Sequence, residues 1–433
     1  MQVRLLGGLV VWVTTLYLAL ATPKKRGKKT GRGKEGAGLY PELGVLGIQE
    51  GNSPALIYTV GRLTALLPSY EHARDELAER GVPLNIKVVH GVGRYAGQAA
   101  LTFRRRQLLA YRAGQLPAGD GRGKRFGVMI DGGRTKLRRI TRKQKGVGKN
   151  KTQRRRFQTE WREPKVIIIF EMDRHGRMKK GTKPIIEGTF EGPDEIMEIL
   201  AMRLHQLGAV NAEIVAYRAD GAPWIWERLD WVTRRVGLKP NQVSRGLDWC
   251  HAVHHISLAL GLLMEPAERQ RVYKKLRKWL RAGSWTKVVR ELRRLAKAIA
   301  LPESSEFWTE INYLNRHGEA GHLDYAKFRR RGLPMGSGAI ESTIRRVINL
   351  RMKGNSIFWK AENAEALLVL RGLVLSGHWK STFAEISHSL ARDRHRHWKW
   401  LSPDMPAELK SNTPISPPQP QVASITGTYV AVA

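Results

Sequence analysis

Three acidic residues of this 433-residue chain stand where carboxylates can bind divalent metal ions together. Asp131 follows the apolar run at 125–130 (RFGVMI), Asp220 comes just after the run at 213–218 (EIVAYR), and Glu341 follows Gly336-Ser337-Gly338. Carboxylate oxygens are ligands that Mg²⁺ prefers, and two such ions can activate an attacking hydroxyl and stabilise a leaving oxygen. These residues therefore predict a phosphoryl-transfer site that holds two Mg²⁺ or Mn²⁺ ions.

The neighbouring elements must bring these carboxylates together. Both apolar runs predict buried strands, and ligand-binding side chains converge at the carboxyl ends of neighbouring strands in an open α/β sheet. We expect Glu341 in the first turn of a long helix that begins at Ala339. Aspartates also make turns, so a carboxylate after a strand is weak evidence by itself. Three rival ligands exist: we assign Asp173 to a hairpin turn and Asp230 to a helix, whereas Asp248 remains an alternative.

The order of predicted elements sets the fold class. Strands are expected at 125–130, 165–170, 184–190, 213–218 and, as a short fifth, 245–249, with an amphipathic helix over 193–207. This order predicts an α/β fold with a mixed sheet flanked by helices.

Composition and pattern divide the chain into six regions. We expect an N-terminal strand and basic loop (1–52), a helical, helix-turn-helix-like DNA-binding region (53–120), the first part of a catalytic core (121–256), a helical insertion (257–333), the C-terminal helical part of the core (334–401) and a disordered tail (402–433). The insertion is inferred because 120 residues separate Asp220 from Glu341, far more than one strand and a loop require. A third helix beginning near Leu84 is the candidate for reading DNA, although plain helical bundles have the same pattern.

The charge of the chain points to a polyanionic partner. There are 75 Lys and Arg residues against 38 Asp and Glu, a formal net charge of +37, and the cations are spread over the whole chain. Nucleic acid fits this distribution better than a membrane surface.

Cys250 is the only cysteine, which excludes an intrachain disulfide and a cysteine-based zinc site. The apolar segment at 5–21 is interpreted as a buried strand or hairpin, with a short signal peptide as the alternative.

One interval is exceptionally basic, and we expect it to contact the DNA backbone, with a solvated hairpin as the alternative. It contains no acidic residue and carries Arg134, Lys136, Arg138, Arg139, Arg142, Lys143, Lys145, Lys149, Lys151, Arg154, Arg155 and Arg156. Arg345, Arg346 and Lys353 follow Glu341 and are further candidates for DNA contact. Trp224, Trp226 and Trp359 are candidates either for the core or for stacking on bases.

Three blocks carry a family resemblance: RADGAPWIWERLDWV from Arg218, LDWCHAVHHISLAL from Leu247 and LPMGSGAIESTIRRVINLRMKGNSIFW from Leu333. They resemble the core blocks of bacterial insertion-sequence DDE transposases with a ribonuclease-H-like core, most closely the ISKra-like group. The resemblance implies that Asp131, Asp220 and Glu341 hold the metal ions, and that Asp248, His251 and Trp359 are accessory residues. It further implies hydrolysis at transposon ends followed by strand transfer into target DNA. The paired N-terminal cysteines of relatives are missing here.

We therefore expect a bacterial, cytoplasmic, nucleoid-associated transposase that acts on DNA as a homodimer or higher oligomer, without a membrane partner. Two other functions use the same features. A ribonuclease-H-like nuclease or resolvase would use the same carboxylates without joining strands. A catalytically inactive DNA-binding protein would need only the positive charge.

Overall fold

The computed structural model describes residues 1–19, 38–142 and 156–396. The predicted basic loop after Pro23, the cations from Lys143 to Arg155 and the predicted tail from 402 lie outside these residues, apart from Gly38 at the end of the loop. The strands are β1 (Gln2–Arg4), β2 (Val10–Trp12), β3 (Leu18–Ala19), β4 (Gly38–Leu39), β5 (Arg125–Gly132), β6 (Thr135–Arg142), β7 (Arg156–Arg162), β8 (Lys165–Glu171), β9 (Ile185–Thr189), β10 (Ile214–Ala219) and β11 (Val243–Leu247).

The helices are α1 (Pro41–Val45), α2 (Pro54–Leu66), α3 (Tyr70–Glu79), α4 (Ile86–Arg112), α5 (Pro193–Gln206), α6 (Pro223–Val236), α7 (Trp249–Gly261), α8 (Pro266–Arg281), α9 (Trp285–Ala298), α10 (Phe307–Glu319), α11 (Tyr325–Arg330), α12 (Gly338–Ile344), α13 (Ala361–Leu375) and α14 (Trp379–Arg396). Two short 3₁₀ helices, η1 (Ala209–Asn211) and η2 (Pro240–Gln242), and a π-helical turn, η3 (Arg345–Asn349), complete the described elements.

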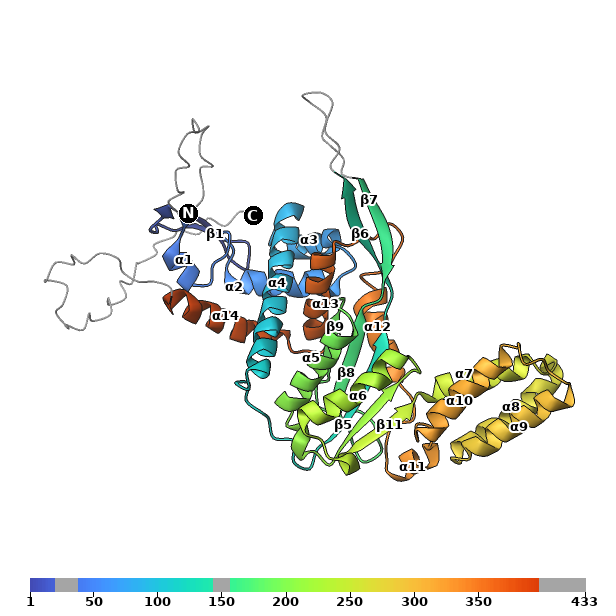
Figure 1. Ribbon diagram of the computed structural model, residues 1–433. Helices are drawn as coiled ribbons and strands as arrows, with labels where there is room; N and C mark the ends of the chain where they lie inside the picture. The colour runs from blue at the N-terminus through green and yellow to red at the C-terminus, as the bar shows by residue number, and fades with distance from the viewer. Residues whose placement is uncertain (20–37, 143–155, 397–433) are drawn as a thin grey trace, which may run out of the picture.

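A mixed five-stranded sheet forms the centre of the protein, in the order β11-β10-β5-β8-β9 (Figure 1). β11, β10 and β5 are parallel, whereas β8 and β9 are antiparallel to their neighbours. The prediction of an α/β fold with a mixed sheet flanked by helices is confirmed. The fifth strand ends at Leu247 and not at Trp249, because Asp248 caps the helix that follows.

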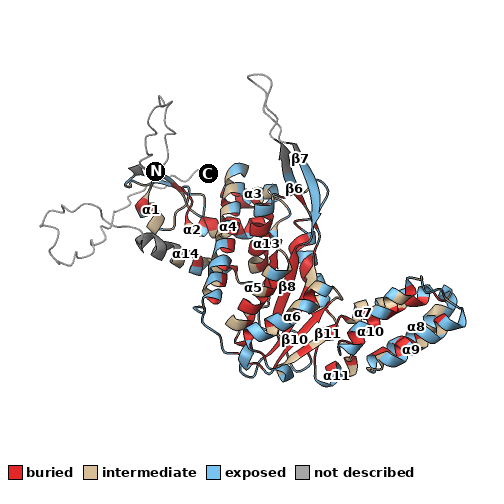
Figure 2. Ribbon diagram, in the orientation of Figure 1, coloured by how far each residue is buried: buried red, intermediate tan, exposed pale blue. Residues whose placement is uncertain are grey.

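Both faces of the sheet are covered, as the buried residues in Figure 2 show. Side chains alternate between the faces of a strand, so Val128 and Ile130 pack with α5 and α6 on one side. Met129 lies on the other face, in the core that includes Ile340 of α12 and Leu368 of α13. Asp131 is two residues after Met129 on the same strand, so its side chain points to the same face of the sheet, which α12 covers.

The N-terminal helical region packs against α13, and the last turns of α4 also reach the core beside α5. Ser53 caps α2 and Asn85 caps α4, each accepting a hydrogen bond from a backbone amide of its helix. The predicted helix beginning near Leu84 is the start of α4, which is 27 residues long and packs against α2 and α13. The segment proposed to read DNA is thus the first part of a helix whose later turns are in the core.

The apolar N-terminus forms a hairpin in which Val3 pairs with Val11. The expectation that it is buried is wrong for the second strand, since Trp12 is 79% exposed and Val10 and Val11 are exposed too. With three residues in each strand, the hairpin is too small to bury both of its faces. Among the described residues, no helix is both long and apolar enough to span a membrane.

The chain between β11 and α12 is helical, as predicted, and includes α7, α8, α9, α10 and α11. α7 to α10 project from the sheet as an arm (Figure 1), and Leu276, Leu280 and Leu292 of this arm belong to the same buried cluster as Met129 and Ile168 of the sheet. The helix that follows is not the long one expected. α12 ends at Ile344, continues as η3 to Asn349, and the chain then turns through Gly354 and Ser356, which has a positive φ.

Candidate active site

Three aspartates lie in one row at the carboxyl ends of three adjacent parallel strands. Ala219 of β10 pairs with Ile130 of β5 and with Leu247 of β11. The next residue on each strand is Asp131, Asp220 or Asp248. Neighbouring strands lie about 4.8 Å apart, so the register alone brings the first two carboxylates into the same small region. The expected convergence of Asp131 and Asp220 at the carboxyl end of the sheet is thus present.

Asp131 carries a carboxyl group that is costly to ionise in this structure. It is partly buried, and its Oδ1 accepts a hydrogen bond of 2.6 Å from the Gly132 amide. Burial raises the pKa of Asp131 to about 6, the Gly132 amide opposes this rise, and the charges of Asp220 and Glu341 add to it. The repulsion from Glu341 means that α12 brings its glutamate into electrostatic range of Asp131.

Asp220 lies in a similar environment. Its Oδ1 accepts a hydrogen bond of 3.1 Å from the Ala222 amide, and its backbone carbonyl accepts one of 2.7 Å from the Trp226 indole. Burial raises the pKa of Asp220, against the opposing effects of the Ala222 amide and His251. Gly221 is needed next to it, because a Cβ there would lie 2.2 Å from the ring of Tyr313.

Asp248 differs from the other two aspartates because its oxygens already have partners. It is fully buried, accepts a hydrogen bond of 2.6 Å from the Cys250 amide, and accepts two from Ser337, at 2.9 Å from the amide and 2.5 Å from the hydroxyl. Although burial raises its pKa, interactions with His251, Ser337 and Cys250 hold the pKa at about 2. Asp248 is therefore a helix cap that ties α7 to the chain before α12.

His251 interacts with all three of these aspartates. Its Nδ1 is 3.9 Å from Asp248 Oδ1, an ion-pair distance that is too long for a hydrogen bond. The interaction with Asp248 raises the pKa of His251, burial opposes this, and Asp220 and Asp131 raise it further. A protonated His251 would thus partly compensate the negative charge of the carboxylates.

Glu341 is exposed in the first turn of α12, which packs against β5 and β8. It also interacts with Cys250 at the start of α7: burial raises the pKa of Cys250, Asp248 and Glu341 raise it too, and Arg277 of α8 lowers it. The helical arm thereby brings a cation near the same site.

The donor set fits a hard divalent cation, because Asp131, Asp220 and Glu341 offer oxygen ligands with mutual repulsion to relieve. In this structure, the side chains of Asp131, Asp220 and Glu341 do not form one cluster. In the described part of the chain, no three His, Cys, Asp or Glu residues are close enough to form a metal site. A metal would therefore require side-chain adjustment, which the exposed Glu341 is free to make.

The described part of the predicted basic interval is mainly strand β6, which pairs with β7 in an antiparallel ribbon that extends from the sheet (Figure 1). β6 begins at Thr135, four residues after Asp131. Arg134 lies 4.7 Å and Lys136 4.9 Å from the centre of the Trp161 ring, and Arg138 lies 5.6 Å from that of Phe157. Trp161 is 45% and Phe157 42% exposed, an arrangement of cations and aromatic rings on an accessible surface. Arg139 is exposed as well; Arg154 and Arg155 lie outside the described residues, as does the side chain of Arg156.

The base of the ribbon is held by the segment after Glu341. Trp359 is buried, its backbone carbonyl accepts a hydrogen bond of 2.8 Å from Arg138, and its indole donates one of 3.0 Å to Met352. Trp359 thus occupies a core position. Arg345, Arg346 and Lys353 are exposed, as DNA contact requires, whereas the neighbouring Arg351 is buried.

Sequence reasoning missed two features of the site. The ion pair of Glu163 and Lys165, 2.5 Å long, affects Asp220 electrostatically. Tyr313 of α10 lies against Gly221, although 91 residues separate them along the chain. Gly221 directly after Asp220 was the one local signal that another group approaches closely there.

Comparison of the chain with protein-family models, curated proteins and solved structures gave no match in any of the three.

Proposed function

We propose that this protein is a DDE transposase with a ribonuclease-H-like core, which cuts DNA at transposon ends and joins the ends to target DNA. The observation that carries the proposal is the register that brings Asp131 and Asp220 to adjacent strand ends, with Glu341 in electrostatic range. The mixed sheet with three parallel strands and two antiparallel ones is compatible with that fold. The resemblance of the three sequence blocks supports the same assignment.

Asp131, Asp220 and Glu341 would hold two Mg²⁺ or Mn²⁺ ions. When bound, such ions activate the attacking hydroxyl and stabilise the leaving oxygen of a phosphodiester. The chain's own contribution is to keep the two aspartates at fixed strand ends. Burial disfavours the ionised forms of Asp131 and Asp220. A bound cation would compensate this cost, because it stabilises the ionised carboxylates. His251 and Asp248 form a second layer that fixes α7 beside them.

DNA reaches the site along the ribbon of β6 and β7. Arg134, Lys136 and Arg138 would contact phosphates, while Trp161 and Phe157 offer exposed aromatic faces to bases or sugars. The ribbon begins a few residues after Asp131, at Thr135, so DNA held there lies next to the carboxylates. Arg345 and Arg346 extend the same positive surface past Glu341.

The direct test uses DNA from either side of the reading frame, labelled at its 3′ ends, with supercoiled plasmid as target. With Mg²⁺ or Mn²⁺ we expect nicked product and, after it, label joined to plasmid; with EDTA we expect neither. Cutting without joined label would favour the nuclease alternative. Binding without cutting in either metal would favour an inactive DNA-binding protein.

The ribbon assignment has its own test in the salt dependence of duplex binding. Replacing Arg134, Lys136 and Arg138 by Gln should make the slope of log affinity against log salt shallower by up to about 2.7, because each phosphate that is no longer neutralised reduces the slope by about 0.9. The matched control is Arg105→Gln with Arg112→Gln, exposed cations on α4 that pair with carboxylates of the same chain. An equal slope in the ribbon variant and the wild type would contradict the assignment.

A further inference from the structure

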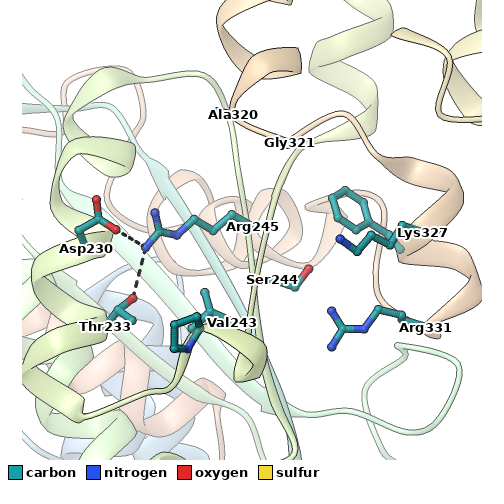
Figure 3. A pocket seen from close by; sticks show the side chains of 11 residues that line it. Asp230, Thr233, Val243, Ser244, Arg245, Ala320, Gly321, Lys327 and Arg331 are labelled. Carbon is teal, nitrogen blue, oxygen red and sulfur yellow. Dashed lines mark hydrogen bonds and ion pairs between the residues drawn. The ribbon is translucent and has the colours of Figure 1, made fainter.

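A cavity of about 410 Å³ lies between α6, the start of β11 and α11 (Figure 3). Val243, Ser244 and Arg245 line it from the amino end of β11, whereas Asp248 and the carboxylate row are at the opposite end of the strands. It is therefore a different place from the candidate active site. Its volume is within the usual range of small-molecule sites.

The cavity has an excess of positive charge. Arg245, Lys327 and Arg331 line it, against one carboxylate, Asp230. In Figure 3 the guanidinium of Arg245 turns toward α6, where it bonds to Asp230 at 2.6 Å, while Lys327 and Arg331 approach from α11. Only one of the three cations has a carboxylate partner among the lining residues.

A fourth cation lies just behind the wall. Arg218 is fully buried, and its described hydrogen bonds go to neutral oxygens: the carbonyls of Pro334, Tyr217 and Ser244 and the Ser244 hydroxyl. Its guanidinium lies 4.2 Å from the centre of the ring of Phe328, which also lines the cavity. A buried charge without a counter-ion is costly, and an anion in the adjacent cavity would reduce that cost.

Two further observations agree with a missing anion. The Nε of Arg245 is buried and has no hydrogen-bond partner, so a donor is left over beside the cavity. Burial lowers the pKa of His322 to about 4, and the charges of Arg245 and Arg218 lower it too. The positive potential is thus felt by the neighbouring buried groups.

We propose that this cavity binds a phosphate group, with Arg245, Lys327 and Arg331 as its ligands. Guanidinium groups match the geometry of phosphate oxygens, and an ammonium adds a point charge. The apolar walls, Pro240, Val243 and Phe328, leave room for an organic group attached to the phosphate. Such a ligand is either a free mononucleotide or a phosphodiester of bound DNA.

The test measures binding of inorganic phosphate and of dAMP by calorimetry, at constant ionic strength and in EDTA. The full chain should bind one equivalent saturably. Lys327→Gln with Arg331→Gln should weaken binding at least tenfold; both side chains are exposed, so folding is expected to survive. The matched control is Arg329→Gln with Arg330→Gln, exposed cations of the same helix that do not line the cavity, with a change of less than twofold.

A gain-of-affinity variant makes the test sharper. Asp230→Asn removes the one carboxylate of the cavity and should tighten phosphate binding about threefold or more, which unfolding would not do. No saturable binding by the wild type, or equal losses in the cavity and control variants, would overturn the proposal.

Comparing dAMP, inorganic phosphate and a short duplex as ligands of the cavity distinguishes a free nucleotide from the DNA backbone. dAMP binding at least tenfold tighter than inorganic phosphate identifies a free nucleotide. Displacement of phosphate from the wild type by a short duplex, together with weaker duplex binding by Lys327→Gln with Arg331→Gln than by the control variant, identifies the DNA backbone.

Discussion

A pair of partly buried carboxylates and a pair of fully buried ones have opposite surroundings in this protein. At the carboxyl end of the sheet, Asp131 and Asp220 accept single backbone hydrogen bonds and repel each other. Between α4, α5, β9 and α13, Glu187 and Glu365 share Arg104, at 3.4 Å and 2.6 Å. Glu187 also pairs with Arg203 at 2.5 Å.

The effect on the protons is opposite as well. Burial raises the pKa of Asp131 to about 6, against the smaller opposing effects of the Gly132 amide and His251. Burial also raises the pKa of Glu187, but Arg203 and Arg104 outweigh it, so its pKa is lowered overall. The internal network joins the N-terminal helices to the sheet through direct ion pairs. Asp131 and Asp220 form no such ion pair with a described residue, and His251, with Lys165 at Asp220, acts on them only at longer range. Carboxylates left in this state are candidates for binding a cation from solution.

The largest effect is expected where charge is removed from the strand ends. Asp131→Asn, Asp220→Asn and Glu341→Gln should each reduce DNA cutting by about 10³-fold or more, because each removes a metal ligand with little change in shape. The melting temperature without metal should not fall, since ionised Asp131 and Asp220 are disfavoured by burial. The measurement is the initial rate of nicking together with a thermal melt in EDTA.

Duplex affinity serves as the control for these three variants and should stay within about threefold of the wild type, because the ribbon is unchanged. A variant that cuts at the wild-type rate would remove that residue from the site.

Removing a charge from the network of Arg104, Glu187 and Glu365 should lower the stability of the fold. Glu365→Gln leaves part of the Arg104 charge buried without its partner and should lower the free energy of unfolding by about 3–5 kcal/mol. Glu365 also accepts hydrogen bonds from Thr189 at 2.8 Å and from the Phe190 amide at 2.7 Å, which adds to the loss. Urea unfolding gives the value.

Glu362→Gln is the matched control, since Glu362 is exposed one turn earlier on α13 and should change stability by less than about 0.5 kcal/mol. Equal unfolding midpoints for the two variants would show that the network does not stabilise the fold.

The smallest expected effect is the pH dependence of stability, which should have opposite signs for Asp131 and for Glu187. The folded-state pKa of Asp131 is raised, so its contribution to stability is complete below about pH 4 and is lost as the pH rises through about 6. The folded-state pKa of Glu187 is lowered, so its contribution is present above the ordinary value of 4.5 and is lost as the pH falls. In EDTA, the stability of Asp131→Asn relative to the wild type should therefore increase between pH 4 and 6.5.

The expected increase is about 1–2 kcal/mol, since one pKa unit corresponds to about 1.4 kcal/mol and Asp131 is only partly buried. Asp173→Asn is the control, because Asp173 is an exposed turn residue whose pKa is lowered by the Arg177 amide. An identical pH profile for wild type and Asp131→Asn would contradict the assigned cost of ionisation.

Local sequence patterns were sufficient for much of the fold. The runs before Asp131 and Asp220 are strands, the segment after Gly192 is a helix, and the chain between β11 and α12 is helical, because apolar periodicity and capping residues act over a few neighbours. The order of the five sheet strands along the chain was likewise predictable. So was the position of Asp131 and Asp220 near the ends of two strands, because each follows an apolar run in the sequence.

Only the tertiary structure decided what surrounds those residues. Asp248 ends a strand just as Asp131 and Asp220 do, yet Ser337, 89 residues away, supplies the hydrogen bonds that make it a cap. Trp359 is buried because β6 lies beside it, and Arg104 is neutralised by Glu187 and Glu365 from two distant elements. The sequence by itself determined the positions of the charges and most of the sheet strands and helices, since these depend on neighbouring residues. Which charges are compensated depends on contacts between distant segments, and those arise only when the chain folds.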